Sequence, residues 1–290
     1  MSDPRKLESR PFDGPLGAEV FGVEPTADLT PDAFASIEAS LRRHKVLLFR
    51  GAIRTNERLT GFARRFGELF RFFEEGTEPG FPEILRVSNL EENGKPIGLT
   101  GTMELPWHTD YANQARPAKE SFLEAVEVPG GGAAATSFID MYAAWETLPA
   151  SLRAAIDGKL ALHRPKAEYD LADSTSATTQ AQRNAIQTAH PIAVRHPETK
   201  RVALYVSPVE TTEIVGASDA WSREIFEQIF DHVIRPENIY RHEWSPGDLM
   251  VFDAIGTMHH REAFAAGMRR FMKQLSTRCE QPLQRAEDRA

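Results

Sequence analysis

Apolar residues occur along this chain mostly in short runs that turn-forming residues interrupt. Runs bounded by Gly, Pro, Asn and Asp are typical of β-strands. They cover residues 10–25, 45–49, 83–90, 121–128, 135–139, 190–206, 239–244, 249–252 and 268–277. The pattern therefore predicts a chain built mainly of short strands, with hairpins among them.

Helical periodicity is confined to a few segments. Thr30 and Pro31 begin one helix, because a hydroxyl caps the first turn and proline suits the first helical position. The other predicted helices cover residues 56–70, residues 141–158 with a break near Pro149, and a segment from Ser218 to just before Pro236. Strand groups with helices between them predict an α+β or mainly β fold. We expect one domain over residues 1–290, with a double-stranded β-helix (jelly roll) core and flanking helices.

Three connecting segments carry a specific expectation. Gly130, Gly132 and Ala135 match a loose dinucleotide-binding pattern, but a strand rather than a helix follows, which favours a hairpin turn. Residues 166–189 have few bulky apolar side chains and are predicted to form a mobile lid or a disordered loop. Phe73 ends an aromatic group before a Gly- and Pro-rich stretch, which indicates either a loop over a pocket or ordinary packing.

Composition narrows the class of protein. The chain has 290 residues, of which 41% are hydrophobic and 26% charged, and a net charge of -8. These values are typical of a soluble globular protein and argue against a nucleic-acid partner. No apolar stretch is long enough to span a membrane or to form a signal peptide. The single cysteine, Cys279, excludes an intrachain disulfide and fits a reducing compartment, so we expect a cytoplasmic protein.

The spacing of histidine and carboxylate residues indicates a metal site. Side chains at i and i+2 of a strand share a face, so His108 and Asp110 can hold one cation together. His259 or His260, far downstream, can supply a third ligand. Two histidines and one carboxylate form the ligand set of non-haem Fe(II) oxygenases. The same spacing recurs at His196/Glu198 and His260/Glu262, so the spacing alone does not identify the site.

Segments over nearly the whole chain match, in order, the sequence pattern of a known protein family. They fall in residues 15–20, 46–51, 107–110, 126–136, 141–148, 247–248, 252–253 and 257–259. With these segments the chain resembles the taurine dioxygenase/aryloxyalkanoate dioxygenase family of Fe(II)- and 2-oxoglutarate-dependent oxygenases. The resemblance implies Fe(II) as the metal and 2-oxoglutarate and O2 as cosubstrates.

The resemblance also implies roles for individual residues. His108, Asp110 and His259 match the iron ligands; the distance from Asp253 selects His259 over its neighbour. The last strand of the family carries an arginine for the distal carboxylate of 2-oxoglutarate, and the spacing here favours Arg270 over Arg269. Thr136 matches the hydroxyl that binds the same carboxylate.

One departure from the family bears on the substrate. Members that take anionic substrates have a second arginine where this chain has Gln274, and a neutral amide cannot neutralise an acid group. We therefore expect a neutral, zwitterionic or cationic small molecule rather than a simple sulfonate or aryloxy acid. Glu104 is a further candidate substrate contact, although a solvated loop acid explains it equally well. Tyr111 and Phe73 complete the candidate substrate-binding residues.

The expected activity is oxidation, most simply hydroxylation, of a small molecule with release of succinate and CO2. In related halogenases a small residue stands at the position of Asp110, so the carboxylate favours hydroxylation. Two alternatives stay open: a cupin-like metal-dependent isomerase or lyase, and a non-catalytic binding protein on the same scaffold. Neither requires the pair Arg270 and Thr136. A homo-oligomer is compatible with the sequence.

Overall fold

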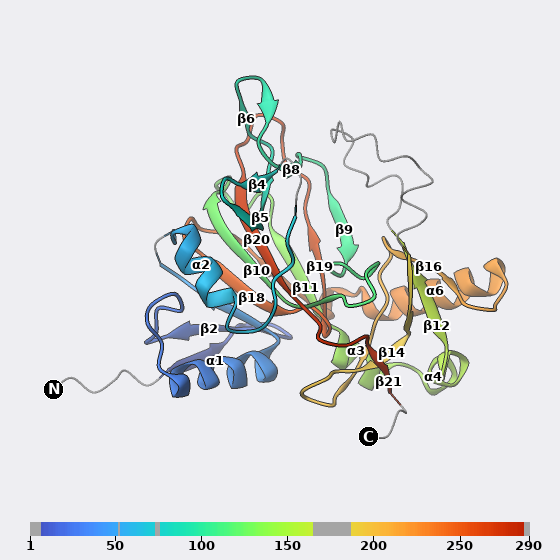
Figure 1. The fold of residues 1–290 in the computed structure, drawn as a ribbon. Helices are drawn as coiled ribbons and strands as arrows, with labels where there is room; N and C mark the ends of the chain where they lie inside the picture. Colours follow the sequence, from blue (N-terminus) through green and yellow to red (C-terminus); the bar gives the residue numbers. More distant parts are fainter. Residues whose placement is uncertain (1–6, 52, 73–75, 165–186, 287–290) are drawn as a thin grey trace.

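The large sheet of this protein runs through the middle of the molecule (Figure 1). The computed structural model describes residues 7–51, 53–72, 76–164 and 187–286. Over these residues the sheet order is β1 (Glu8–Pro11), β2 (Ala18–Phe21), β3 (Val46–Phe49), β18 (Leu249–Asp253), β10 (Ala118–Glu127), β20 (Phe271–Arg278), β5 (Phe81–Ser88) and β4 (Thr77–Glu78), with β8 (Leu99–Thr100) beside β5. Every pair is antiparallel except β2 with β3 and β5 with β8.

A second sheet faces the first and carries much of the candidate site. Its order is β17 (Ile239–His242), β11 (Thr136–Asp140), β19 (Thr257–Arg261) and β9 (Leu105–His108). The smaller sheets of the described residues are β13 (Thr188–Pro191), β12 (Leu160–His163) and β16 (Thr211–Ile214); β15 (Val202–Leu204), β14 (Ala193–Arg195) and β21 (Gln284–Arg285); and β6 (Glu91–Glu92) with β7 (Lys95–Pro96). The fold is thus mixed, with mostly sheet and few helices.

Helices cover opposite sides of the molecule. They are α1 (Pro31–His44), α2 (Asn56–Ala63), α3 (Met141–Thr147), α4 (Ala150–Ile156), α6 (Asp219–Val233) and the short 3₁₀ helix η2 (Pro236–Asn238). Figure 1 shows α1 and α2 on one side and α4 and α6 on the other. The side chain of Thr30 accepts a hydrogen bond from Ala33 and that of Ser218 accepts one from Trp221, so both predicted helix starts are confirmed. The break near Pro149 is confirmed as well, since α3 ends before it and α4 begins after it.

The core follows from strands that are apolar on both faces. In β18, Met250 and Phe252 pack against the second sheet, whereas Leu249 and Val251 pack toward α1 and α2. Side chains of one strand alternate between its faces, so a continuous apolar run indicates a strand covered on both sides. Phe138 of β11 contributes the facing side of the inter-sheet layer, and its ring meets Phe252 with centroids 5.2 Å apart.

Two sequence expectations are wrong in detail. The helix predicted over residues 56–70 ends at Ala63, because the N–H groups of Arg65 and Phe66 bond to carbonyls three residues back and Gly67 follows. Leu69 then forms an isolated bridge with Thr277 of β20. The predicted hairpin over residues 121–139 does not exist either, since β10 and β11 belong to different sheets. The glycine turn carries the chain from one sheet to the other.

Three further expectations concern a hairpin, the candidate lid with Phe73, and membrane-spanning segments. The hairpin predicted within residues 190–206 is confirmed by the pairing of β14 with β15. Residues 166–186 of the expected lid and the side chain of Phe73 lie outside the described residues, whereas Thr188 and Ala189 belong to β13. None of the described helices is both long and apolar enough to cross a membrane.

Candidate metal and cosubstrate site

Two strands of the second sheet bring the histidines together. In the register of β9 with β19, His108 lies opposite His259, and their ring centroids are 4.0 Å apart. Asp110 lies in the turn that begins just after β9 ends. One ligand atom from each of these three residues lies within 4.8 Å of the other two. The sequence spacing thus produces a convergent group of two imidazoles and one carboxylate.

Hydrogen bonds orient His108 and Asp110 of this group. Nδ1 of His108 donates to the carbonyl of Pro106 at 2.7 Å, which leaves its Nε2 lone pair free. Oδ2 of Asp110 accepts from the Ser121 hydroxyl at 2.6 Å. Oδ1 of Asp110 lies 3.9 Å from Nε2 of His259. Such outer contacts fix the tautomer and orientation of metal ligands in proteins.

The protonation of the group suits a divalent cation. Burial lowers the pKa of both His108 and His259, so both imidazoles are neutral. Burial raises the pKa of Asp110, because a carboxylate that leaves water needs a compensating charge. Neutral imidazole and carboxylate are the ligand forms that metal binding requires. The three residues therefore fit the metal that the sequence indicates.

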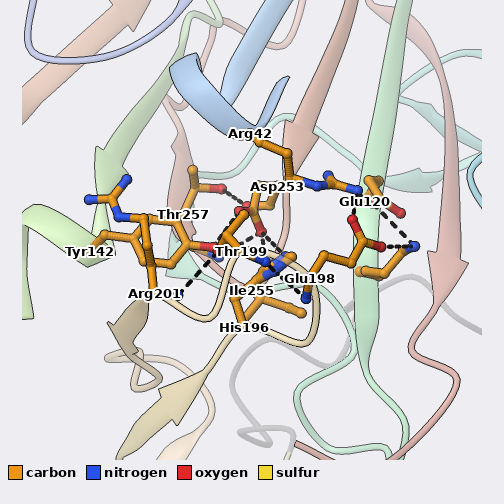
Figure 2. A network of polar contacts seen from close by, with 12 residues as sticks. Arg42, Glu120, Tyr142, His196, Glu198, Thr199, Arg201, Asp253, Ile255 and Thr257 are labelled. Carbon is orange, nitrogen blue, oxygen red and sulfur yellow. Dashed lines mark hydrogen bonds and ion pairs between the residues drawn. The ribbon is translucent and has the colours of Figure 1, made fainter. Parts of the chain in front are cut away.

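The turn before β19 is held by a buried polar network (Figure 2). Oδ2 of Asp253 accepts from the Tyr142 hydroxyl at 2.6 Å, and Oδ1 accepts from the backbone N–H groups of Ile255 and Gly256. A Cβ at Gly256 would lie 2.0 Å from the Tyr142 ring, so only glycine allows this approach. The network fixes the start of the strand that carries His259.

Arg270 lies just before β20 and is 2% exposed. Among the described residues its Nε and Nη1 have no hydrogen-bond partner. Burial and the nearby Arg261 lower the pKa of Arg270 to about 9. Arg269 differs from Arg270 in both burial and pairing, since it is exposed and pairs with Glu127 at 2.5 Å. A buried guanidinium without an acidic partner fits an anionic ligand.

Thr136 and Arg261 face each other across β11 and β19. The Thr136 hydroxyl accepts a hydrogen bond from Nε1 of Trp244 at 2.9 Å, which leaves its own hydrogen available to donate. Arg261 donates to Thr100, Gly101 and Met103 and so ties that loop to β19. Burial lowers the pKa of Arg261 to about 10.

The candidate substrate residues occupy different environments. Gln274 donates from Nε2 to Oδ1 of Asp110 at 3.1 Å, so it supports the metal group directly. The Glu104 carboxylate lies 2.6 Å from Nε2 of His260 and is 56% exposed, apart from the convergent group. Tyr111 stacks on Phe70 with ring centroids 4.4 Å apart.

Sequence reasoning missed residues that lie beside this group. Ser121 orients Asp110 from the middle of β10. The Glu210 carboxylate accepts a hydrogen bond from the backbone N–H of Thr109, and burial together with Asp110 raises the pKa of Glu210 to about 8. The only available signal was an acid directly after the apolar stretch 202–209.

Comparisons with known proteins identify a family that this chain matches. Residues 8–276 match the family described as "Taurine catabolism dioxygenase TauD, TfdA family". The chain is 36% identical over 282 residues to pentalenolactone F synthase from Streptomyces arenae, covering 93% of this chain and 94% of that protein. It is 31% identical to an alpha-ketoglutarate-dependent sulfate ester dioxygenase from Pseudomonas putida, covering 88% and 84% of the two chains.

Solved structures give the same result. A putative alpha-ketoglutarate-dependent taurine dioxygenase from Burkholderia xenovorans superposes with a TM-score of 0.79 at 29% identity, covering 96% of this chain and 91% of that one. AAD-2 in complex with Mn(II) and N-oxalylglycine superposes with a TM-score of 0.78 at 25% identity, covering 96% and 99% of the two chains.

Proposed function

The chain belongs to the TauD, TfdA family of dioxygenases, and from this premise we propose that it hydroxylates a small organic molecule. It is an Fe(II)- and 2-oxoglutarate-dependent dioxygenase, as its relatives are. Membership in this family also argues against the two alternatives, a cupin-like metal-dependent isomerase or lyase and a non-catalytic binding protein. The two facing sheets are, in this proposal, the two halves of a double-stranded β-helix within a single domain.

His108, Asp110 and His259 are the proposed iron ligands. The observation that carries this proposal is their convergence, with ligand atoms within 4.8 Å of one another. Fe(II) bound there, together with 2-oxoglutarate, supplies the activation of O2 for attack on a C–H bond. The protein's part is to keep both imidazoles neutral and to hold the carboxylate through Ser121 and Gln274. Two histidines and one carboxylate leave the remaining coordination positions to ligands.

Arg270 and Thr136 are the proposed contacts for the distal carboxylate of 2-oxoglutarate. The buried, unpartnered Nε and Nη1 of Arg270 support this role, because they leave the guanidinium with donors that no described residue satisfies. The Thr136 hydroxyl has a hydrogen left to donate after accepting from Trp244. A bound carboxylate would also supply the counter-charge that this buried guanidinium lacks among the described residues.

The proposed substrate is not a simple sulfonate or aryloxy acid. Gln274 stands where a second arginine would be needed, and its amide is engaged with Asp110. An anionic substrate group buried near Gln274 would lack the guanidinium that a second arginine would supply, which would be unfavourable. The relative named pentalenolactone F synthase is 36% identical to this chain, which is consistent with a substrate outside those two classes.

Oxygen uptake and succinate formation test the proposal. We expect purified protein with Fe(II) and 2-oxoglutarate to consume O2 slowly without substrate and faster with an accepted substrate. A panel of sulfonates, aryloxyacetates, amines and neutral alcohols would identify that substrate class. Absence of both 2-oxoglutarate binding and O2 uptake in the metal-loaded protein would contradict the proposed activity. Efficient turnover of taurine or an aryloxyacetate would contradict only the substrate class.

A further inference from the structure

Arg261 is a second buried guanidinium, and it belongs to the strand that carries His259. The two residues are two positions apart in β19, so their side chains share the face that looks toward the large sheet. In the register of β19 with β11, Arg261 lies opposite Thr136, as His259 lies opposite Phe138. Arg261 is 3% exposed. The strand therefore brings a candidate metal ligand and a cation into the same layer between the sheets.

Only part of the Arg261 guanidinium is used within the protein. Its Nη1 donates to the Thr100 hydroxyl at 3.1 Å and to the Gly101 carbonyl at 3.3 Å, and its Nη2 donates to the carbonyls of Thr100 and Met103. Its Nε is buried and has no hydrogen-bond partner in the described part of the chain. None of these partners is an acid, so they supply no counter-charge. A buried charge without an acidic partner is unfavourable unless a ligand brings one.

Arg270 lies close to Arg261, although it leads into a strand of the other sheet. The carbonyl of Arg270 accepts a hydrogen bond from the Ser88 hydroxyl at 2.9 Å. Ser88 lies beside Thr100 in the parallel pairing of β5 with β8, and paired strands are about 4.8 Å apart. Thr100 in turn accepts from Nη1 of Arg261. Two hydrogen bonds and one strand spacing thus connect the two arginines.

The free donors of the two arginines and of Thr136 match the capacity of one carboxylate. They are Nε and Nη1 of Arg270, Nε of Arg261 and the Thr136 hydroxyl. An ionised carboxylate has about four lone-pair sites on its two oxygens. Arg270 and Thr136 supply three of the donor atoms, and Arg261 supplies the fourth. Since like charges that lie close together repel, a carboxylate shared by the two arginines also offsets their repulsion.

We propose that Arg261 binds the distal carboxylate of 2-oxoglutarate through its Nε, beside Arg270 and Thr136. The inference rests on the proposed function, because it takes 2-oxoglutarate as the cosubstrate. Arg261 then has two roles: Nη1 and Nη2 hold residues 100–103, and Nε contacts the ligand. An arginine that only held this segment would affect all ligands of the metal alike, whereas a direct contact affects only those with a distal carboxylate.

Two metal-chelating probes that differ only in the distal group test the assignment. N-oxalylglycine has a distal carboxylate, whereas N-ethyloxamate has a methyl group in its place. Calorimetry with Mn(II)-loaded protein gives the affinity for N-oxalylglycine directly and that for N-ethyloxamate by competition. We expect Arg261→Met to weaken N-oxalylglycine binding about tenfold or more and N-ethyloxamate binding less than about threefold, because only the first probe can accept a hydrogen bond from Nε.

Thr100→Val is the matched control for the role of Arg261 in holding residues 100–103. It removes the hydroxyl that accepts from Nη1 and leaves Nε in place. Arg153→Met is the control for losing an arginine that donates to backbone carbonyls, here those of Glu146 and Leu148. Both variants should keep the ratio of the two affinities within about threefold of that of the unmodified protein.

A spectrum of the unmodified protein tests the contact even where Arg261→Met fails to fold. Zn(II) replaces Mn(II), and the arginine Nε–H signals are recorded by NMR before and after each probe is added. A hydrogen bond to a carboxylate moves an N–H proton signal to higher frequency. N-oxalylglycine should therefore shift two Nε–H signals, those of Arg270 and Arg261, and N-ethyloxamate should leave both in place. The spectrum of Arg270→Met identifies which of the two belongs to Arg270.

The outcomes separate this inference from the proposed function. If the unmodified protein loaded with metal did not bind N-oxalylglycine, both would be overturned. Equal affinity for the two probes would overturn the roles of both arginines. Selective N-oxalylglycine binding overturns the role of Arg261 alone in any of three cases: Arg261→Met leaves the ratio of affinities unchanged, Thr100→Val lowers that ratio as much as Arg261→Met does, or N-oxalylglycine shifts only the signal of Arg270.

Discussion

Replacing Arg270 with methionine should change ligand affinity and folding stability in opposite directions. Methionine fills a similar apolar volume but cannot donate to a carboxylate. Each charge-assisted hydrogen bond contributes roughly 1.5–3 kcal/mol. Loss of two such hydrogen bonds to the distal carboxylate should therefore weaken 2-oxoglutarate binding by about a hundredfold or more.

The same substitution should stabilise the protein without its ligands. The pKa of Arg270 falls from 12.5 to about 9 on folding, because burial and Arg261 disfavour its charge. A base whose pKa is lowered in the folded state destabilises that state while it is charged: the cost is complete below the folded-state pKa and vanishes above the ordinary value. At neutral pH the folded protein therefore carries the full free-energy cost of the buried Arg270 charge. At about 1.4 kcal/mol per pKa unit this cost is of the order of 3–5 kcal/mol.

Arg269→Met is the matched control. Its side chain is exposed, and water screens its pairing with Glu127. Calorimetric titration of 2-oxoglutarate into Mn(II)-loaded protein gives the affinity, and urea unfolding at pH 7 of the metal-free protein gives the stability. If Arg270→Met bound 2-oxoglutarate within about threefold of the unmodified protein, or unfolded more easily than it, the argument from an unpaired guanidinium would be refuted.

Three further outcomes follow from the contacts around the metal group. His259→Ala should abolish Mn(II) binding and turnover, whereas His260→Ala should keep both; calorimetry that showed the reverse would exchange their roles. Gln274→Leu should weaken Mn(II) binding about 10- to 100-fold, because it removes the amide that donates to Oδ1 of Asp110. An unchanged Mn(II) affinity would show that this contact is dispensable. His163 has its pKa lowered to about 3 by burial and by a neighbouring histidine, so the unfolded chain binds one more proton between pH 6.5 and 3 and stability falls as pH falls. In urea unfolding of metal-free protein at pH 5.5 and 4.5, His163→Asn should reduce that loss by about 1.4 kcal/mol per pH unit, and an unchanged slope would count against its neutral state.

Local signals in the sequence predicted most of the elements correctly, because those signals act within a few residues. Thr30 and Ser218 cap their helices through N–H groups three residues ahead. The end of α2 depends instead on a distant partner, since Leu69 forms a bridge with Thr277. A helical stripe of apolar residues carries no information about such a partner, so residues 64–70 were assigned to the helix.

The false hairpin has a similar cause. A strand, a glycine turn and a second strand give the same sequence pattern in two cases: when the two strands pair with each other, and when they lie in different sheets. In the structure β10 pairs with β18 and β20, both of which come from the C-terminal part of the chain. The neighbours of β10 were therefore fixed by contacts that no local pattern records.

The position of Glu104 shows how strand register decides which acid reaches the metal. Glu104 was a candidate for the pocket because the family often has a substrate-contacting polar residue four positions before the first iron ligand, and in a regular strand that position shares a face with His108. The pairing of β9 with β19 is irregular, however: His108 lies opposite His259, whereas Leu105 lies opposite Arg261. Three steps along β9 thus match two steps along β19, and the extra residue reverses the alternation. Glu104 consequently meets His260, on the opposite face from His259, at 2.6 Å. The carboxyl that does contact the ligand segment, at the N–H of Thr109, comes from Glu210, about a hundred residues later in a chain of 290. A change that removed the irregularity in β9 should therefore move Glu104 toward the metal, at the expense of the pairing that aligns His108 with His259.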